Sequence, residues 1–226
     1  MVSPVKLSDE FYAQRWEGAN IPIRFRGVRL NDYEPSHYTG AEAKKHAEAF
    51  VDAFEDHHVS AKRAAAGIFP SDRSNIGRGL LFYGRNGTRK SSLANAILTE
   101  IQYRSPSYGV FYVRFSDWKK ALTDTFEKED SEEKVKAKRI LQATTSRSIV
   151  VLDDIGQEHR TQSGFTESSL HELLRVRYEA ARPTIITTNV SMSKIAEIYG
   201  DSFDSFRHDA FDAYPMLGID TRKTED

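Results

Sequence analysis

The stretch GRNGTRKSS, from Gly84 to Ser92, constrains the fold of this chain more than any other segment. It fits the phosphate-loop pattern G-x-x-x-x-G-K-[ST] at Gly84, Lys90 and Ser91, but Arg89 stands where the second glycine of the pattern belongs. In such a loop the backbone N–H groups face the phosphates, the lysine reaches the outer phosphates and the hydroxyl binds magnesium. The loop must therefore be preceded by a strand and followed by a helix.

The flanking residues supply that order. Residues 80–83 form a short apolar run, and residues 90–103 repeat apolar positions with helical spacing. Further apolar runs at residues 110–115, 149–152 and 184–187 predict more strands, with helical patterns between them. This alternation predicts an α/β fold, a parallel sheet with helices on both faces.

The chain before the loop predicts a shorter, less regular part. Residues 1–38 mix aromatic, basic and proline positions without a clear period, and we interpret them as an N-terminal lead-in that is available to a partner. Thr39 and Glu42 stand at capping-box spacing, which predicts the start of a helix. Residues 61–79 have the composition of a surface loop. We therefore divide the chain into the lead-in, 1–38, and a core, 39–226.

Composition excludes several classes of protein. There are no cysteines, so a disulfide framework, a Cys-ligated zinc module and thiol catalysis are excluded. The 32 basic and 33 acidic residues nearly balance, so any contact with a polyanion must come from a local patch. No apolar run approaches the roughly 20 residues of a membrane span, and MVSPVKLSDEF lacks the apolar stretch of a signal peptide. We expect a cytoplasmic protein without a membrane partner.

Two acids follow the most apolar predicted strand, in IVVLDD. In open parallel sheets ligands bind at the carboxyl ends of the strands. We expect Asp153 to hold magnesium together with Ser91, and Asp154 to orient or deprotonate the attacking water. Asn189 ends the predicted strand in PTIITTN, where its amide would position a water. The alternatives are an ordinary strand exit and a turn asparagine.

The loop itself supplies the nucleotide contacts. If the position of Arg89 requires φ > 0, arginine costs about 1–2 kcal/mol there, although its charge could also meet a phosphate. We expect weakened ATP affinity or turnover as a result. The residues expected to bind the nucleotide are Gly84, Asn86, Gly87, Thr88, Arg89, Lys90, Ser91 and Ser92.

Three segments resemble the Walker A, Walker B and sensor segments of the DnaC and IstB group of AAA+ ATPases: GLLFYGRNGTRKSS, SIVVLDDIG and LRVRYEAARPTIITTN. The segments ANIPIRFRGVRLNDY, IAEIYGDSF and GIDTRK resemble those that bracket the ATPase core of this group. The resemblance runs from about residue 19 to residue 223. It implies an AAA+ P-loop NTPase core, ATP and Mg²⁺ as cofactors, and ATPase activity.

The same resemblance implies an oligomeric ATPase, a ring or helix of subunits, that helps to load a DnaB-like replicative helicase onto single-stranded DNA. In such assemblies an arginine from one subunit completes the site of the next. Arg207 is the candidate for this catalytic arginine, with Arg175 and Arg177 as weaker ones. The chain departs from the group in having little room and no cysteine for the usual N-terminal helicase-binding domain, so we expect either a short version of that domain or a core fragment. Two alternatives stay open, a non-hydrolysing helicase adaptor or inhibitor and an IstB-like transposition helper.

A path for single-stranded DNA is a further hypothesis. Bases stack on aromatic side chains beside a basic groove. The alternative is that the aromatic residues belong to the core and the basic ones are solvated. The candidates are Arg104, Arg114, Lys119 and Lys120 with Tyr103, Tyr112 and Trp118.

Overall fold

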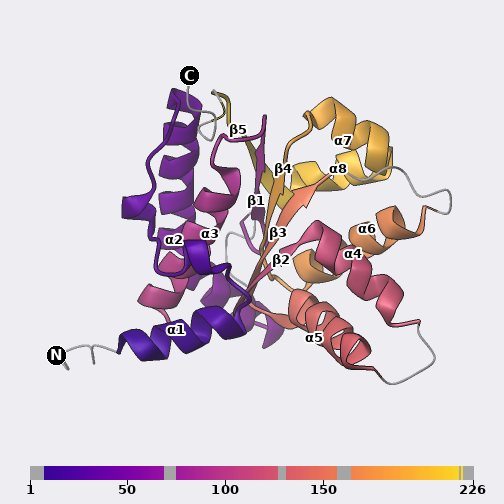
Figure 1. Cartoon of the computed structure of the whole chain (residues 1–226), viewed down its shortest axis with the longest axis horizontal. Coiled ribbons are helices and arrows are strands. Elements are labelled where there is room, and N and C mark those ends of the chain that lie inside the picture. Colours follow the sequence, from indigo (N-terminus) through magenta and orange to yellow (C-terminus); the bar gives the residue numbers. More distant parts are fainter. Residues whose placement is uncertain (1–7, 69–74, 127–130, 157–163, 219, 221–226) are drawn as a thin grey trace.

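A computed structural model describes residues 8–68, 75–126, 131–156, 164–218 and 220 of the chain. Its centre is a five-stranded sheet in the order β2-β3-β4-β1-β5, and every neighbouring pair is parallel (Figure 1). Strand β4 therefore lies between the strand that leads into GRNGTRKSS and the strand that ends in two acids. The strands are β1 (Gly79–Tyr83), β2 (Val110–Arg114), β3 (Ile149–Ile155), β4 (Thr184–Thr188) and β5 (Phe211–Pro215).

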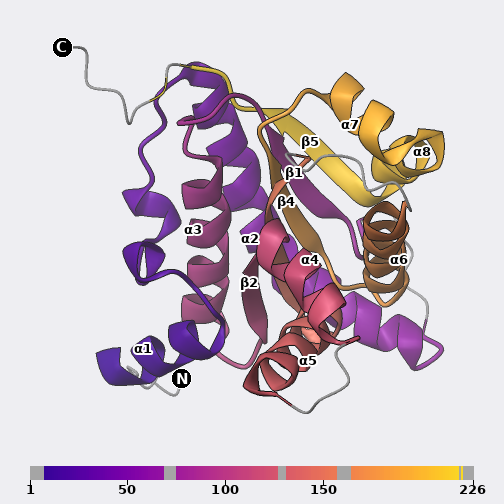
Figure 2. The same cartoon turned by 45° about the vertical axis from the view of Figure 1, so that its right-hand side comes forward.

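Helices cover both faces of the sheet, as predicted. In Figures 1 and 2, α1, α2 and α3 lie on one side, and α4 to α8 lie on the other. The helices are α1 (Asp9–Gly18), α2 (Tyr38–Ala65), α3 (Lys90–Arg104), α4 (Phe115–Asp124), α5 (Glu132–Ser146), α6 (Phe165–Glu179), α7 (Met192–Tyr199) and α8 (Asp201–Ala210), with short 3₁₀ turns at Ile23–Phe25 and Leu30–Asp32.

Alternation along the strands divides the apolar interior into two cores. Ile149 and Val151 of β3 join the core beneath α2 and α3, whereas Val150 and Leu152 join the core beneath α4 to α8. Successive side chains of a strand point to opposite faces, so the next residue, Asp153, belongs to the face that α3 covers. This places the first acid of IVVLDD on the side of the phosphate loop.

The lead-in is more regular than its sequence predicts. Helix α1 begins after Ser8, whose hydroxyl accepts a hydrogen bond from the Phe11 N–H at 3.2 Å. Further along, Arg29 binds both carboxylate oxygens of Glu100 on α3, at 2.6 and 2.9 Å. The lead-in is thus a helix and two 3₁₀ turns fastened to the core.

Helix α2 differs from its expected bounds at both ends. Its N-cap is His37, whose side chain accepts from the Thr39 N–H, rather than Thr39 itself. Thr39 instead accepts a hydrogen bond from the Leu217 N–H. The helix runs on to Ala65, into the expected loop, because AKRAA is a run of strong helix formers. Residues 69–74 of that loop lie outside the described residues.

Other elements also differ from the sequence prediction. Phe126 lies beyond the end of α4 and is 71% exposed. Strand β5 and helices α7 and α8 have no counterpart among the predicted elements. The charged run EKEDSEEKVKAKR, residues 127–139, is typical of a solvated helix face. Residues 127–130 lie outside the described part, and the rest enters α5. In the part of the chain that the structure describes, no helix is both long and apolar enough to cross a membrane.

Candidate nucleotide-binding site

The loop between β1 and α3 has the backbone of a phosphate cradle. Gly87 (φ 79°) and Arg89 (φ 64°, ψ 23°) both adopt the left-handed conformation. Arg89 therefore occupies a position that favours glycine, as the motif predicts. Gly84 is needed for a different reason, because a Cβ there would overlap the Met216 carbonyl oxygen.

Lys90 places its charge inside this loop. Its side chain is buried, and the ammonium donates to the carbonyl oxygens of Gly84 and Arg85, both at 2.7 Å. Thr88 is buried beside it and donates to the Arg85 carbonyl at 3.0 Å. The loop is therefore wrapped around its lysine, and the ammonium is held by the loop's own carbonyl groups.

Arg89 reaches toward the lead-in. One of its guanidinium nitrogens donates to the Glu34 carbonyl oxygen at 3.0 Å. Beside it lies Tyr33, a buried phenol whose hydroxyl has no hydrogen-bond partner among the described residues. Burial raises the pKa of Tyr33 to about 12, and the charge of Arg89 opposes this rise. The substituted loop position thus links the phosphate loop to the segment before α2.

The chain beyond β5 forms another wall of the site. The Met216 N–H donates to the Tyr83 carbonyl at 2.7 Å, which continues the β1–β5 ladder past the strand ends. Farther on, Asp220 lies against Gly87, since a Cβ added at Gly87 would overlap its carboxylate and come within 2.5 Å of its Cα. Of the segment GIDTRK, residues 219 and 221–223 lie outside the described residues.

Asp153 is held by two hydroxyl groups. The carboxylate is 6% exposed and accepts from the Tyr112 hydroxyl at 2.8 Å on one oxygen and from the Thr187 hydroxyl at 2.6 Å on the other. Burial and the neighbouring Asp153 charge raise the pKa of Tyr112, so the phenol stays protonated and donates. Strands β2, β3 and β4 each supply one member of this group.

Asp154 and Asn189 meet at the same sheet edge. Asp154 has φ 68°, at a register shift between β3 and β4, and its N–H donates to the Thr187 hydroxyl at 2.9 Å. The Asn189 amide donates to an Asp154 carboxylate oxygen. A left-handed aspartate costs about 1–2 kcal/mol, and such strain concentrates at functional sites. The structure brings the two residues together, and their catalytic roles remain predictions.

The residues present fit a magnesium nucleotide. Mg²⁺ prefers hard oxygen ligands in small number, with phosphate oxygens and water completing its shell. Two hard oxygen ligands are available, the Asp153 carboxylate on β3 and the Ser91 hydroxyl in the first turn of α3. The glycine-rich turn, the lysine and the helix N-terminus provide the anion site. Asn86 is exposed on the loop and Ser92 is half-buried on α3, so both lie in this region as predicted.

The sequence matches one known protein family over more than half of its length. The sequence model of the IstB-like ATP-binding protein family matches residues 61–205, which is 145 of the 226 residues. The chain belongs to this family. The match includes the phosphate loop, both acids and Asn189, and it ends before Arg207.

Several solved structures have a similar fold. The DnaC helicase loader has a TM-score of 0.65 and 20% identity, over 87% of this chain and 100% of that one. DnaI has a TM-score of 0.63 and 18% identity, over 88% and 93%. A primosome component from Streptococcus pyogenes serotype M3 has a TM-score of 0.60 and 20% identity, over 89% and 92%. No match was found among curated proteins. The fold of this IstB-like protein is therefore that of the AAA+ P-loop ATPases.

The three arginines considered for a neighbouring subunit's site lie in different settings. Arg207 on α8 is 13% exposed and donates through Nε to Asp204 at 2.6 Å. Arg175 is exposed on α6, with its guanidinium 5.8 Å from the centre of the Phe206 ring. Arg177 is completely buried, which makes its assignment to an interface wrong.

Arg177 instead joins the ends of three elements. Its guanidinium donates to five neutral oxygens at 2.8–3.3 Å, which belong to Thr144, Thr145, Arg147, Pro183 and Thr184. Burial lowers the pKa of Arg177 to about 9. The side chain closes the C-terminal end of α5 and fixes it to the start of β4. A charged side chain is normally expected at the protein surface, so the sequence did not predict this buried role of Arg177.

The proposed aromatic path for DNA is wrong for two of its three rings. Tyr112 and Trp118 are 4% and 2% exposed and belong to the core, where their faces are covered by neighbouring side chains. Tyr103 is half-buried against Tyr12 and Trp16. The Tyr112 and Trp118 rings cannot stack on bases without unpacking the core.

The basic residues of that path have their own arrangement. Arg104 pairs with Asp52 at 2.5 Å and with Glu100 at 3.0 Å, and Lys120 pairs with Asp124 at 2.7 Å. Arg114 is exposed and Lys119 half-buried. All four basic side chains remain at least partly exposed, so their contact with a DNA strand stays a prediction.

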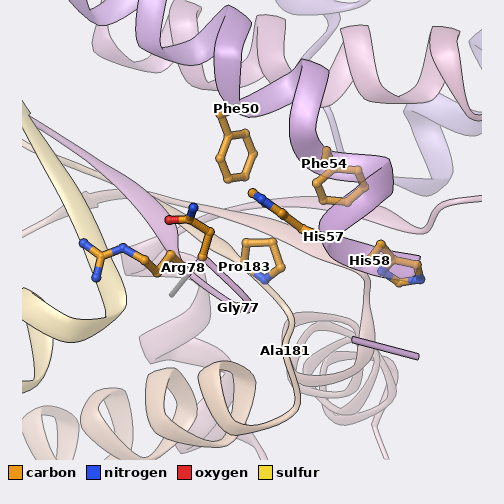
Figure 3. Close-up of a pocket in the computed structure, with 9 residues that line it drawn as sticks. Phe50, Phe54, His57, His58, Gly77, Arg78, Ala181 and Pro183 are labelled. Carbon is orange, nitrogen blue, oxygen red and sulfur yellow. The ribbon is translucent and has the colours of Figure 1, made fainter. Parts of the chain in front are cut away.

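A small hollow lies at the amino edge of the sheet, opposite the phosphate loop. Phe50, Phe54, His57 and His58 of α2 face Arg78 and Pro183, which precede β1 and β4 (Figure 3). Its volume of about 10 Å³ admits roughly one water molecule. Burial lowers the pKa of His58, with Lys62 as a second cause. The hollow is too small for a nucleotide.

Proposed function

We propose that this protein is an ATP-binding helicase loader that assists the placement of a DnaB-like replicative helicase on single-stranded DNA. The observation that carries the proposal is the convergence of the phosphate loop, Asp153, Asp154 and Asn189 at one sheet edge. The fold similarity to the DnaC helicase loader, which extends over the whole of that chain, supports the same function. We place this function in the cytoplasm.

The residues of the site have separate roles in this proposal. The N–H groups of residues 84–89 and the Lys90 ammonium bind the phosphates of ATP. The Ser91 hydroxyl and the Asp153 carboxylate hold Mg²⁺, which when bound neutralises phosphate charge. Asp154 orients the attacking water and accepts its proton, and Asn189 holds the Asp154 carboxylate in place.

Self-association completes the site. Subunits in a ring or helix bring Arg207 of one copy to the ATP of the next, where a guanidinium stabilises charge on the transferred phosphoryl group. Arg207 must then leave Asp204, with which it pairs in the isolated chain. Arg207→Ala should leave ATP affinity unchanged and lower the rate of hydrolysis.

We further propose that ATP is bound more weakly than in a loop with glycine at position 89. The Arg89 guanidinium donates to the Glu34 carbonyl, so this donor is directed to the lead-in and not to a phosphate. Asp220 adds a carboxylate beside Gly87, whose N–H would face a phosphate. Both features lower the affinity of the loop for an anion.

Two other functions are favoured by specific observations. The IstB-like family match favours a helper ATPase in transposition. Arg89 and Asp220 at the phosphate loop favour an adaptor that binds a helicase without hydrolysing ATP. Each predicts a different partner or a different dependence on ATP.

The test is reconstituted loading of a DnaB-like helicase onto circular single-stranded DNA. We expect ATP-dependent loading with the wild type, none with Lys90→Ala, and ATP binding without turnover with Asp154→Asn. Loading that persists in Lys90→Ala would support the adaptor. Binding to a transposase and not to the helicase would support the transposition helper.

A further inference from the structure

We propose that Tyr112 is a positioning residue that orients the Asp153 carboxylate for magnesium and connects it to the N-terminal lead-in. This inference rests on the proposed nucleotide site. It concerns a residue that the phosphate-loop and acidic motifs do not contain.

The first observation is the hydrogen bond itself. The Tyr112 hydroxyl and the Asp153 carboxylate are both buried, 2.8 Å apart, on neighbouring strands of the sheet face that α3 covers. The Thr187 hydroxyl binds the other carboxylate oxygen at 2.6 Å. Two hydroxyl donors from opposite sides fix the plane of the carboxylate, and they leave its remaining lone pairs for a cation.

The second observation is that the backbone of Tyr112 is held from outside the sheet. Strand β2 is an edge strand, and the Tyr112 N–H donates to the Ala19 carbonyl at 2.9 Å. The Asn20 amide donates to the Tyr112 carbonyl, also at 2.9 Å. Both main-chain groups of this one residue are therefore bound by the lead-in, directly after α1.

Together these contacts form one continuous path. Asn20 adopts a left-handed conformation (φ 58°), which turns the chain away from α1 at the point of contact. A shift of α1 on the core would move the Tyr112 backbone and, through the phenol, the Asp153 carboxylate. A partner that binds the lead-in is thereby placed to change how the site holds magnesium.

The chemistry of the pair fits a positioning role. In this hydrogen bond the phenol is the donor and the carboxylate is the acceptor. Tyr112 touches neither nucleotide nor water in this account and acts through Asp153. Residues that orient metal ligands in this way change metal affinity by roughly 10–100-fold when they are removed.

The experiment is a magnesium titration of nucleotide binding with Tyr112→Phe, which keeps the ring and removes the donor. Binding of a fluorescent ATP analogue is measured in EDTA and at increasing Mg²⁺ concentration. We expect a rise of about 10-fold in the Mg²⁺ concentration at half-saturation, with affinity in EDTA unchanged. Tyr108→Phe is the matched control, a buried tyrosine just before β2 that packs on Phe54 and His58.

The outcomes separate this inference from the proposed function. If the wild type binds nucleotide and Tyr112→Phe has the same magnesium dependence, only the role of Tyr112 is overturned. No nucleotide binding by the wild type overturns the nucleotide site and this inference together. Should Tyr112→Phe fail to fold, Asn20→Ala decides. This variant removes the clamp on the Tyr112 carbonyl, and a magnesium dependence equal to that of the wild type overturns the proposal.

Discussion

The two edges of the sheet use polar residues in opposite ways. At the amino edge, Arg177 is completely buried and its guanidinium makes five hydrogen bonds to groups of the fold. At the carboxyl edge, Asp154 and Arg89 are partly or fully exposed in left-handed conformations. At the amino edge Arg177 stabilises the fold, whereas at the carboxyl edge Asp154 and Arg89 hold strained backbone conformations near solvent.

This difference follows from the parallel topology. All five strands run in one direction, so the loops that can approach a ligand from the sheet's carboxyl ends are gathered at one edge. The other edge is free to be closed by side chains such as Arg78, which donates to the carbonyls of His208 and Asp209 at the end of α8. Substitutions at the amino edge should therefore change stability, and those at the carboxyl edge should change binding.

The largest expected effect is on stability, from Arg177→Ala. The substitution leaves buried carbonyl groups without a donor and creates a cavity, and we expect a loss of about 4 kcal/mol in the free energy of unfolding. Urea denaturation measures it. Arg175→Ala is the matched control on the same helix, where only an exposed contact with Phe206 is lost, and should cost about 1 kcal/mol or less. Equal losses in the two variants would contradict the contrast between the edges.

The next effect is on binding, from Gly87→Ala. A side chain at φ 79° is strained and would overlap the Asp220 carboxylate, so the loop must shift. We expect ATP affinity to fall by at least about 10-fold, which is 1.4 kcal/mol. Gly67→Ala is the control, because Gly67 has φ 80° with no atom within 4 Å of an added Cβ. Gly67→Ala should cost stability through backbone strain alone and leave ATP affinity unchanged, and a similar loss of binding in both variants would refute the role of the loop.

The smallest effect is expected from Arg89→Gly. Arg89 has φ 64° in the loop without nucleotide, so the relief of backbone strain by glycine should mainly raise the free energy of unfolding. Removal of the arginine side chain should also give phosphate more room in the loop. We expect ATP binding to tighten by roughly 3-fold, or about 0.7 kcal/mol. Ala181→Gly relieves similar strain (φ 54°) at the amino edge and should leave affinity unchanged. Unchanged affinity in Arg89→Gly would show that this loop tolerates arginine.

The carboxyl edge was more predictable from sequence than the amino edge. The motif spacing around Lys90 and the two acids after a buried run were enough to predict the convergence of the site. The reason is physical, since the carboxyl ends of parallel strands share one edge. The left-handed conformation at position 89 follows from the glycine that the motif normally has there.

Other contacts could not be predicted in the same way. The acceptors of Arg177 include carbonyls about 30 residues earlier in the chain, and a main-chain carbonyl has no signature in the sequence. Alternation places Tyr112 on a buried face but does not say that its hydroxyl meets Asp153. The approach of Asp220 to Gly87 depends on the course of the chain after β5, a strand that the apolar pattern did not predict.

The central claim is that GRNGTRKSS is a working phosphate loop despite Arg89. The most direct test is titration of the purified protein with a fluorescent ATP analogue and magnesium, beside Lys90→Ala with its fold verified by circular dichroism. We predict saturable binding by the wild type that is lost in Lys90→Ala. No binding at millimolar nucleotide, or equal binding by the two proteins, would contradict the claim.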